Sequence, residues 1–324
     1  MREVQATRRA LLGGAMAGAA LCAGTASAQG GRVTSLVMPY APSGGQELLG
    51  RILIEGFAER FGGSFVMDHR PGAGTTLAAR HVARARPDAQ TLLVGTNVTF
   101  AQAQFAYRNP GYDPDRDFAH ISLLAEALYF LCVNPKWQSV QEVVEEARRR
   151  PGQLAYTSWG VGSVAHLTGV DFCRREGIDM IHVPFNGTAA AVTEVIAGRA
   201  DFIFCILSSC LPHVEAGRLR AVATPSPERI PGFPEIRTMV EHGYSDFVQL
   251  PWFSLSGPAG LPEETALALE EVTRAAFAKE SAKQRLAALG LVPAARGAAD
   301  MRARIASDRV TNQRLMHQAG IEPQ

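Results

Sequence analysis

Two short glycine-bearing loops each stand between an apolar, strand-like run and a helical stretch. The first is Pro39 to Gly45 (PYAPSGG) and the second is Ser158 to Ser163 (SWGVGS). Glycine lets the backbone approach a ligand closely, and the helix that follows presents unpaired N–H groups at the positive end of its dipole. Such a helix start binds a carboxylate, phosphate or sulfate without Lys or Arg. Each loop alone can equally be a tight turn, but two of them favour a small-anion site.

The first loop does not match a nucleotide-binding loop, because no Lys-Ser/Thr pair follows its glycines. A third segment, Val183 to Thr188 (VPFNGT), has the same strand–loop–helix form. Asn186 there can donate a hydrogen bond to a ligand oxygen. The alternative is an ordinary turn in which Gly187 adopts the left-handed conformation.

Ser163 and His166 raise an enzymatic alternative, because residues three apart lie near one face of a helix. A hydrolase would need His166 as a base oriented by a carboxylate, and the G-x-S-x-G elbow is missing. Ser163 is better interpreted as a helix N-cap that also donates to an anion. His166 either lines the cleft or packs on the helix face. We predict no catalytic residue and keep an exported hydrolase as an alternative.

The N-terminus predicts export. Residues 1–28 combine Arg2, Arg8 and Arg9 with an uncharged apolar run and an Ala26-Ser27-Ala28 exit, which is typical of a cleaved signal peptide. The apolar run is too short to favour a membrane anchor. The adjacent arginines also resemble a twin-arginine export signal, so the Sec and twin-arginine routes both stay open.

Composition excludes several functional classes. The chain has 32 Lys and Arg against 31 Asp and Glu, so no basic excess predicts binding to nucleic acid or to an anionic membrane surface. Cys132, Cys173, Cys205 and Cys210 form no C-x-x-C motif and no zinc spacing, so we expect no metal and no cofactor. An oxidising compartment permits a disulfide that the sequence cannot assign.

The hydrophobic pattern predicts an α/β protein with two lobes facing a cleft, because strand-like runs alternate with helical stretches. Ser139 and Glu142 predict a capping box at one helix start. We assign 30–124 plus 252–324 to lobe one and 125–251 to lobe two. We expect strands at 33–39, 64–68, 91–95, 121–133, 154–157, 180–183, 202–206, 219–223 and 253–257, and helices at 46–61, 75–84, 140–150, 164–175, 189–197, 211–216, 262–279, 282–288 and 298–318.

Many ordered segments resemble the solute receptors of tripartite tricarboxylate transporters, also called Bug proteins. The segments extend over nearly all of the chain after residue 28. They are VMPYAPSGGQE at 37–47, DHRPGAG at 68–74, PDAQTLLVGT at 87–96, YDPDRDFAHISLLA at 112–125, YTSWGVGSVAHL at 156–167, IHVPFNGTAAAVTEVIAGRADFIF at 181–204, LPHVEAGRLRAVA at 211–223 and RLAALGLVP at 285–293.

The resemblance implies a type II, periplasmic-binding-protein-like fold in which each lobe is a mixed sheet flanked by helices. It implies a periplasmic receptor, expected to be a monomer, that binds a small organic acid and delivers it to membrane permease subunits. A sensory role is the other receptor alternative. The implied ligand-binding residues are Tyr40, Ala41, Ser43, Gly44, Gly45, Thr96, Ser158, Gly160, Gly162, Ser163, His166, Phe185, Asn186, Gly187 and Cys205.

Three positions depart from the family pattern. Cys205 stands where many relatives have an Asp that pairs with the ammonium group of amino-acid-like ligands. A thiol cannot neutralise a cation, so the sequence predicts a dicarboxylate, a hydroxy acid or an aromatic acid without an amino group. Glu47 replaces the usual Asp. Trp159 is bulkier than the common residue and either stacks on an aromatic ligand or packs against the protein.

Overall fold

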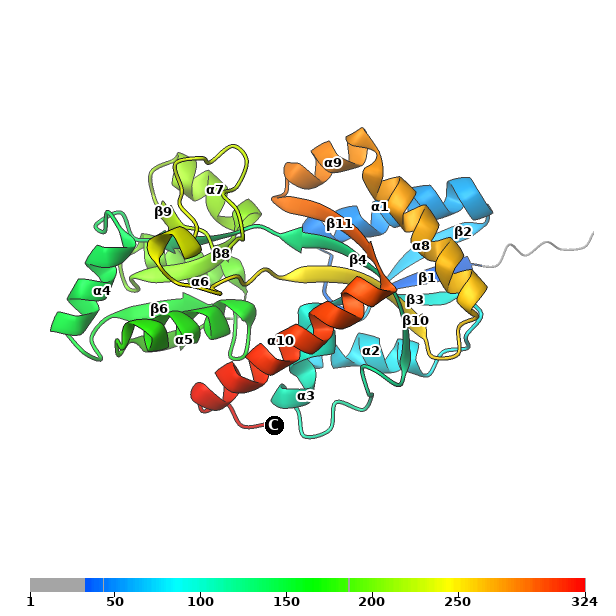
Figure 1. Ribbon diagram of the computed structural model, residues 1–324, viewed down its shortest axis with the longest axis horizontal. Coiled ribbons are helices and arrows are strands. Elements are labelled where there is room, and N and C mark those ends of the chain that lie inside the picture. Colours follow the sequence, from blue (N-terminus) through cyan, green and yellow to red (C-terminus); the bar gives the residue numbers. More distant parts are fainter. Residues whose placement is uncertain (1–32, 43, 186, 324) are drawn as a thin grey trace, which may run out of the picture. The chain divides into compact units, whose positions relative to one another are not determined.

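Figure 1 shows the computed structural model, which describes residues 33–42, 44–185 and 187–323. The predicted signal peptide lies outside the described residues, as do the predicted ligand residues Ser43 and Asn186. From Val33 onward the chain forms one compact unit. Among the described residues, no helix has the length and apolar character needed to cross a bilayer.

The first sheet has six strands in the order β11-β4-β10-β3-β1-β2. β1 pairs in parallel with β2 and β3, which confirms the predicted β-α-β-α-β unit. β10 runs antiparallel to β3 and β4, and β11 runs antiparallel to β4, so the sheet is mixed. The strands are β1 (Val33–Met38), β2 (Ser64–His69), β3 (Thr91–Thr96), β4 (Phe118–Ala127), β10 (Trp252–Pro258) and β11 (Leu291–Gly297).

The second sheet has five strands in the order β7-β6-β8-β5-β9. β6 pairs in parallel with β7 and β8, whereas β5 is antiparallel to β8 and β9. The strands are β5 (Tyr129–Val133), β6 (Ala155–Ser158), β7 (Ile181–Pro184), β8 (Phe202–Ile206) and β9 (Arg220–Ala223). Together the two sheets confirm the α/β fold with two mixed sheets.

Helices flank both sheets (Figure 1). We call the first sheet with its helices lobe one, and the second sheet with its helices lobe two. The helices of lobe one are α1 (Gly44–Phe61), α2 (Thr76–Ala83), α3 (Ala103–Ala106), α8 (Glu263–Ala278), α9 (Glu280–Ala287) and α10 (Ala298–Gln318). The helices of lobe two are α4 (Val140–Arg149), α5 (Val164–Glu176), α6 (Thr188–Ile196) and α7 (Leu207–Glu215).

The stretch predicted as one strand at 121–133 is two strands in different sheets. β4 ends at Ala127 and β5 begins at Tyr129, so the chain changes sheet at Leu128. The chain returns to the first sheet at Trp252, where β10 begins. We therefore propose Leu128, rather than residue 125, as the first lobe boundary, and keep the second boundary beside Trp252.

Local sequence signals position the helices as expected. The Ser139 hydroxyl caps α4 by accepting from the Glu142 N–H at 3.2 Å, which confirms the predicted cap. The Glu142 carboxylate accepts from the backbone N–H of Gln138 at 2.7 Å, one residue before the position of a standard capping box. In α1, Leu49, Leu53 and Phe57 are fully buried and share one helix face.

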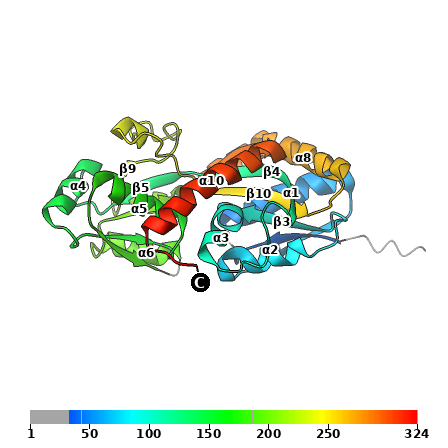
Figure 2. The same cartoon turned by 60° about the horizontal axis from the view of Figure 1, so that its bottom comes forward.

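The C-terminal helix α10 links the two lobes. Figures 1 and 2 both show it extending from the first sheet toward α5. Leu315 and Met316 of α10 pack on Leu167 of α5, and the Arg314 guanidinium lies 3.4 Å from the buried Asp171 carboxylate. The sequence predicted α10 as a helix over 298–318 but did not indicate this contact.

Candidate functional site

The first predicted loop leaves β1 and leads into the N-terminus of α1. His69 Nδ1, at the end of β2, hydrogen-bonds the Tyr40 carbonyl at 2.9 Å, and His69 Nε2 lies 2.7 Å from Glu47 Oε1 in the first turn of α1. The loop is thus fastened to the neighbouring strand and to its own helix. Ala41 and Gly44 are exposed, whereas Gly45 is half-buried. The exposed backbone at the start of α1 is therefore available to an anion.

Tyr40 connects this loop to the end of β3. Its surface is 38% exposed, but its hydroxyl contacts Thr96. Desolvation raises the pKa of the Tyr40 hydroxyl, and the hydrogen bond to Thr96 opposes that rise. Thr96 is almost fully buried, and its hydroxyl lies 3.3 Å from that of Thr99. The structure therefore brings together two predicted ligand residues from separate strand ends.

The second predicted loop is held in shape by Ser158. The Ser158 hydroxyl donates to the Gly160 carbonyl at 2.9 Å and accepts from the Gly160 N–H at 3.2 Å. It also lies 2.8 Å from His182 Nε2. Ser158 is fully buried, so its side chain builds the loop. Gly160 and Gly162 have φ angles of 141° and 74°, which favour glycine.

The Ser163 hydroxyl accepts from the His166 N–H at 3.3 Å and so caps α5, as the sequence predicted. His166 Nδ1 accepts from the Gly162 N–H at 3.0 Å, which leaves the ring proton on Nε2. The Ser163 hydroxyl therefore bonds the His166 backbone rather than the imidazole. This geometry lacks the serine–base contact that a hydrolase needs.

His182, which the sequence analysis did not select, completes the support of the second loop. The His166 and His182 rings are stacked with centroids 3.6 Å apart, and the Tyr156 ring stacks on His182 at 5.0 Å. Burial lowers the pKa of His166 to about 3, assisted by His182, and burial lowers the pKa of His182 to about 4. Both rings are therefore neutral near pH 7. The one sequence signal that could have indicated this role of His182 was its position on the strand before the third loop.

The third predicted loop is tied to the second. The Phe185 N–H donates to the Ser158 carbonyl at 2.9 Å, and Phe185 packs on the apolar core of lobe two. Gly187 has a φ angle of 106° and precedes α6. Phe185 therefore lies directly beside the second loop, because β6 and β7 are parallel neighbours.

Cys205, a predicted ligand residue on an apolar strand, lies in the protein core. Its side chain is fully buried in the lobe-two core, and its thiol donates to the Ile206 carbonyl at 3.5 Å. In this conformation no ligand can touch the thiol. The half-buried Trp159 packs edge-on against Tyr129, with ring centroids 5.8 Å apart. In this conformation Trp159 therefore packs against the protein, which was one of its two predicted roles.

A cavity of about 240 Å³ lies between the two lobes. Asn97, which follows Thr96, and Val164, which follows Ser163, both line it. Gln102 also lines it, and the buried Gln102 Oε1 has no hydrogen-bond partner. Buried polar atoms are normally paired, so an orphaned oxygen of this kind is a position for water or for a ligand donor. The cavity lies beside the end of β3 and the start of α5, but none of the predicted ligand residues that the structure describes lines it.

Comparison with known proteins identifies the family of this chain. Residues 49–321 match the sequence model described as "Tripartite tricarboxylate transporter family receptor" (TctC). The chain belongs to this family. A curated relative from Pseudomonas sp. (strain P51), the "UPF0065 protein in tcbD-tcbE intergenic region", is 30% identical over 286 residues and covers 85% of each chain. Family members are solute-binding receptors rather than enzymes.

Two solved structures of proteins from R. palustris resemble this receptor. Rpa4515 with adipate has a TM-score of 0.80 and 29% identity, covering 90% of this chain and 99% of that chain. MatC (Rpa3494) with bound malate has a TM-score of 0.74 and 26% identity, covering 88% of this chain and 98% of that chain. Both comparisons support the two-lobe fold.

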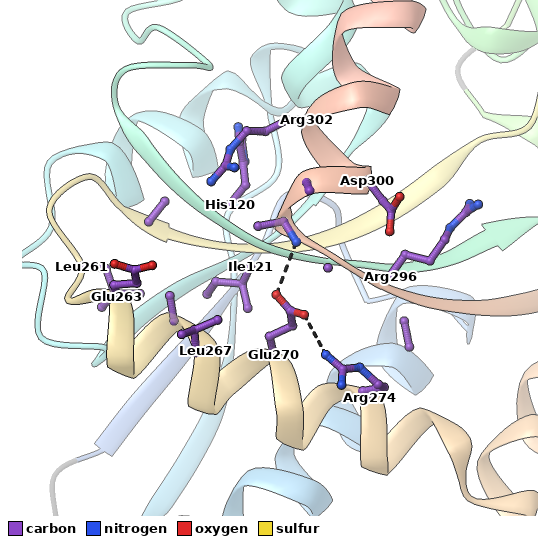
Figure 3. Close-up of a pocket in the computed structure, with 16 residues that line it drawn as sticks. His120, Ile121, Leu261, Glu263, Leu267, Glu270, Arg274, Arg296, Asp300 and Arg302 are labelled. Carbon is purple, nitrogen blue, oxygen red and sulfur yellow. Dashed lines mark hydrogen bonds and ion pairs between the residues drawn. The ribbon is translucent and has the colours of Figure 1, made fainter.

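The TctC receptor also has a cavity of about 760 Å³ in lobe one, between α8 and the start of α10 (Figure 3). Glu270 pairs with Arg274 of the same helix at 2.8 Å, and it connects α8 to the start of α10 by accepting from the Ala298 N–H at 3.4 Å. None of the predicted ligand residues that the structure describes lines this cavity. Within the described ranges, no group of three His, Cys, Asp or Glu side chains is placed to hold a metal ion.

The buried histidines of the TctC receptor predict loss of stability in mild acid. An unfolded histidine has a pKa of about 6.5, whereas His166 and His182 titrate at about 3 and about 4 in the fold. Between about pH 6.5 and about pH 4 the unfolded chain binds more protons than the folded chain. The free energy of unfolding therefore has its full histidine contribution above about pH 6.5 and falls as the pH decreases toward about 4. We expect the urea midpoint to fall between pH 7 and pH 5, before most carboxylates titrate.

A His182→Asn variant provides the control. Asparagine preserves a hydrogen-bonding group beside Ser158 but does not titrate. The stability of this variant should depend less steeply on pH, by up to about 1.4 kcal/mol per pH unit, the slope of one proton. Equal slopes for the two proteins between pH 6.5 and pH 5 would contradict the assignment of His182 as a buried neutral group.

Proposed function

We propose that this TctC receptor is exported to the periplasm, where it captures a small organic acid and presents it to permease subunits of a tripartite tricarboxylate-type transporter. The observation that carries the proposal is the pair of helix starts, α1 in lobe one and α5 in lobe two. Each follows a loop without a charged side chain. The first loop is held by a hydrogen bond to His69 of β2, and the second by hydrogen bonds between Ser158 and Gly160. Preformed loops of this kind bind anions with little ordering cost.

Two anion-binding helix starts favour a ligand with two acidic or polar ends. One carboxylate would bind the backbone near Gly44 and Gly45. The other end would bind the segment from Gly160 to Ser163, where the backbone turns toward α5. Adipate and malate, the ligands named for the two R. palustris structures, are both dicarboxylates. We therefore propose a dicarboxylate or a hydroxy acid as the ligand class, and an aromatic acid as the remaining member of the predicted set.

The ligand is proposed to lack an amino group. The position after Phe204 is the neutral and fully buried Cys205, so it offers no carboxylate to an ammonium group. Burying an unpaired cation costs several kcal/mol. Glu47, the acid nearest to the first loop along the chain, is engaged by His69 at 2.7 Å.

Malate and aspartate separate these possibilities, because they differ only by a hydroxyl in place of an ammonium group. We expect calorimetry at pH 7.5 to show binding of malate or adipate and at least about 30-fold weaker binding of aspartate, which corresponds to about 2 kcal/mol. Benzoate tests the aromatic class in the same titration. A saturating acid should also stabilise the protein by about 2.7 kcal/mol at 100 times its dissociation constant.

Two outcomes contradict different parts of the proposal. Tighter binding of aspartate than of malate would overturn the argument from Cys205 but leave the carboxylate site intact. Stabilisation by sugars or metal ions, with no response to any acid, would overturn the carboxylate site itself. The permease role is tested by deleting the gene: cells should lose uptake of the identified acid, and a loss of transcriptional response alone would favour the sensory alternative.

A further inference from the structure

Three of the four mature cysteines lie together on one face of the lobe-two sheet. Cys205 of β8 pairs across the strands with Phe130 of β5, and Cys132 is two residues further along β5, so Cys132 and Cys205 point to the same side. Cys210 belongs to the first turns of α7, which covers that side. All three side chains are fully buried. Cys173 belongs to a separate core cluster around α5.

Cys210 is the central member of this cluster. It packs in the same buried cluster as both neighbours. The side-chain interaction with Cys210 raises the pKa of the Cys132 and Cys205 thiols, and the same interactions lower the pKa of Cys210. The thiol hydrogens of Cys205 and Cys210 meanwhile point to backbone carbonyls, at 3.5 and 3.6 Å.

We propose that Cys210 forms a disulfide with one of its two neighbours, Cys132 or Cys205, when the chain folds in the presence of a disulfide oxidant. In this reaction two thiols lose two protons and two electrons and form one S–S bond. The oxidant's disulfide accepts them and is reduced to two thiols. The third cysteine of the cluster keeps its thiol and can attack the new bond, so the disulfide can exchange between partners.

The disulfide would lie near Leu128, where the chain passes from the first sheet to the second. The first residue of α7, Leu207, donates its N–H to the Leu128 carbonyl at 2.9 Å, and Leu128 is where the chain changes sheet. The Leu207 side chain also packs on Gly290, where an added Cβ would lie only 2.7 Å from it. A bond from Cys210 to the sheet would therefore fix the start of α7 against this connection. The biological occurrence of the bond rests on the proposed export to an oxidising compartment.

The test counts thiols in the chain from residue 29 onward, the form that the predicted cleavage leaves. The protein is denatured and reduced, refolded in a mixture of oxidised and reduced glutathione, then alkylated under denaturing conditions and weighed by mass spectrometry. We expect two alkylated cysteines instead of four. Peptide mapping should join Cys210 to Cys132 or Cys205, and the oxidised protein should melt several degrees above the reduced one.

Two serine variants keep the outcome decisive. Cys173→Ser should still lose two thiols on oxidation, whereas Cys210→Ser should lose none. Four free thiols in the refolded wild-type chain, a bond that includes Cys173, or oxidation that persists in Cys210→Ser would each overturn the proposal. Malate and adipate titrations of the same samples report separately on the proposed function, because they do not depend on the thiol count.

Discussion

Replacing Gly160 by valine is expected to reduce organic-acid affinity by about 100-fold or more, which is roughly 2.8 kcal/mol of binding free energy. Gly160 has a φ angle of 141°, a conformation that a β-branched residue adopts only with strain. An added Cβ would meet no atom within 4 Å, so the damage comes from the backbone and not from a clash. The loop must then rearrange, and the hydrogen bonds between Ser158 and Gly160 are lost. Calorimetry with the best acid measures the effect.

Gly177→Val is the matched control for this prediction. Gly177 ends the same helix α5, also has a positive φ angle of 61°, and also has open space where a Cβ would stand. Both variants should lose about 1–3 kcal/mol of folding stability through backbone strain. Only the change at Gly160 should impair binding. Equal affinity for the two variants would show that the second loop does not contact the ligand.

Replacing Arg304 by methionine is expected to lower the unfolding free energy by about 3 kcal/mol. The Arg304 guanidinium pairs with the Glu126 carboxylate at the end of β4, with Asp308 at 3.0 Å, and with the Leu250 carbonyl at 3.1 Å. Glu126 and Leu250 belong to the two chain segments that connect the lobes. Methionine keeps the length of the side chain but leaves two partly buried carboxylates without this partner.

Arg285→Met tests whether burial causes the effect. Arg285 pairs with Glu55 at 2.9 Å on the surface of lobe one, where the two side chains are 38% and 60% exposed. Exposed pairs contribute less than about 1 kcal/mol. Thermal and urea unfolding should therefore separate the two variants by at least about 2 kcal/mol. Similar losses would mean that the Arg304 network is no more important than a surface ion pair.

Local signals predicted many elements because their causes are local. The apolar spacing of α1 and the Ser139 and Ser163 caps act within one or two helical turns, and the structure confirms each of them. The glycine loops were recognised from their composition, and Gly160, Gly162 and Gly187 have positive φ angles, which depend on the residue itself. The strand β11 was missed because Pro293 and two alanines carry a weak strand signal, and the strand forms only by pairing with β4.

The sequence by itself determined the α/β class, the loop positions, the cap at Ser163 and the absence of a charge at Cys205, because these properties belong to single residues or short segments. Only the tertiary structure decided that His182 supports Ser158, that Cys210 meets Cys132 and Cys205, and that Arg304 fastens both connections between the lobes. Each of these contacts joins residues that are 24 or more positions apart, apart from Cys205–Cys210. Their proximity depends on strand order, which no local pattern specifies.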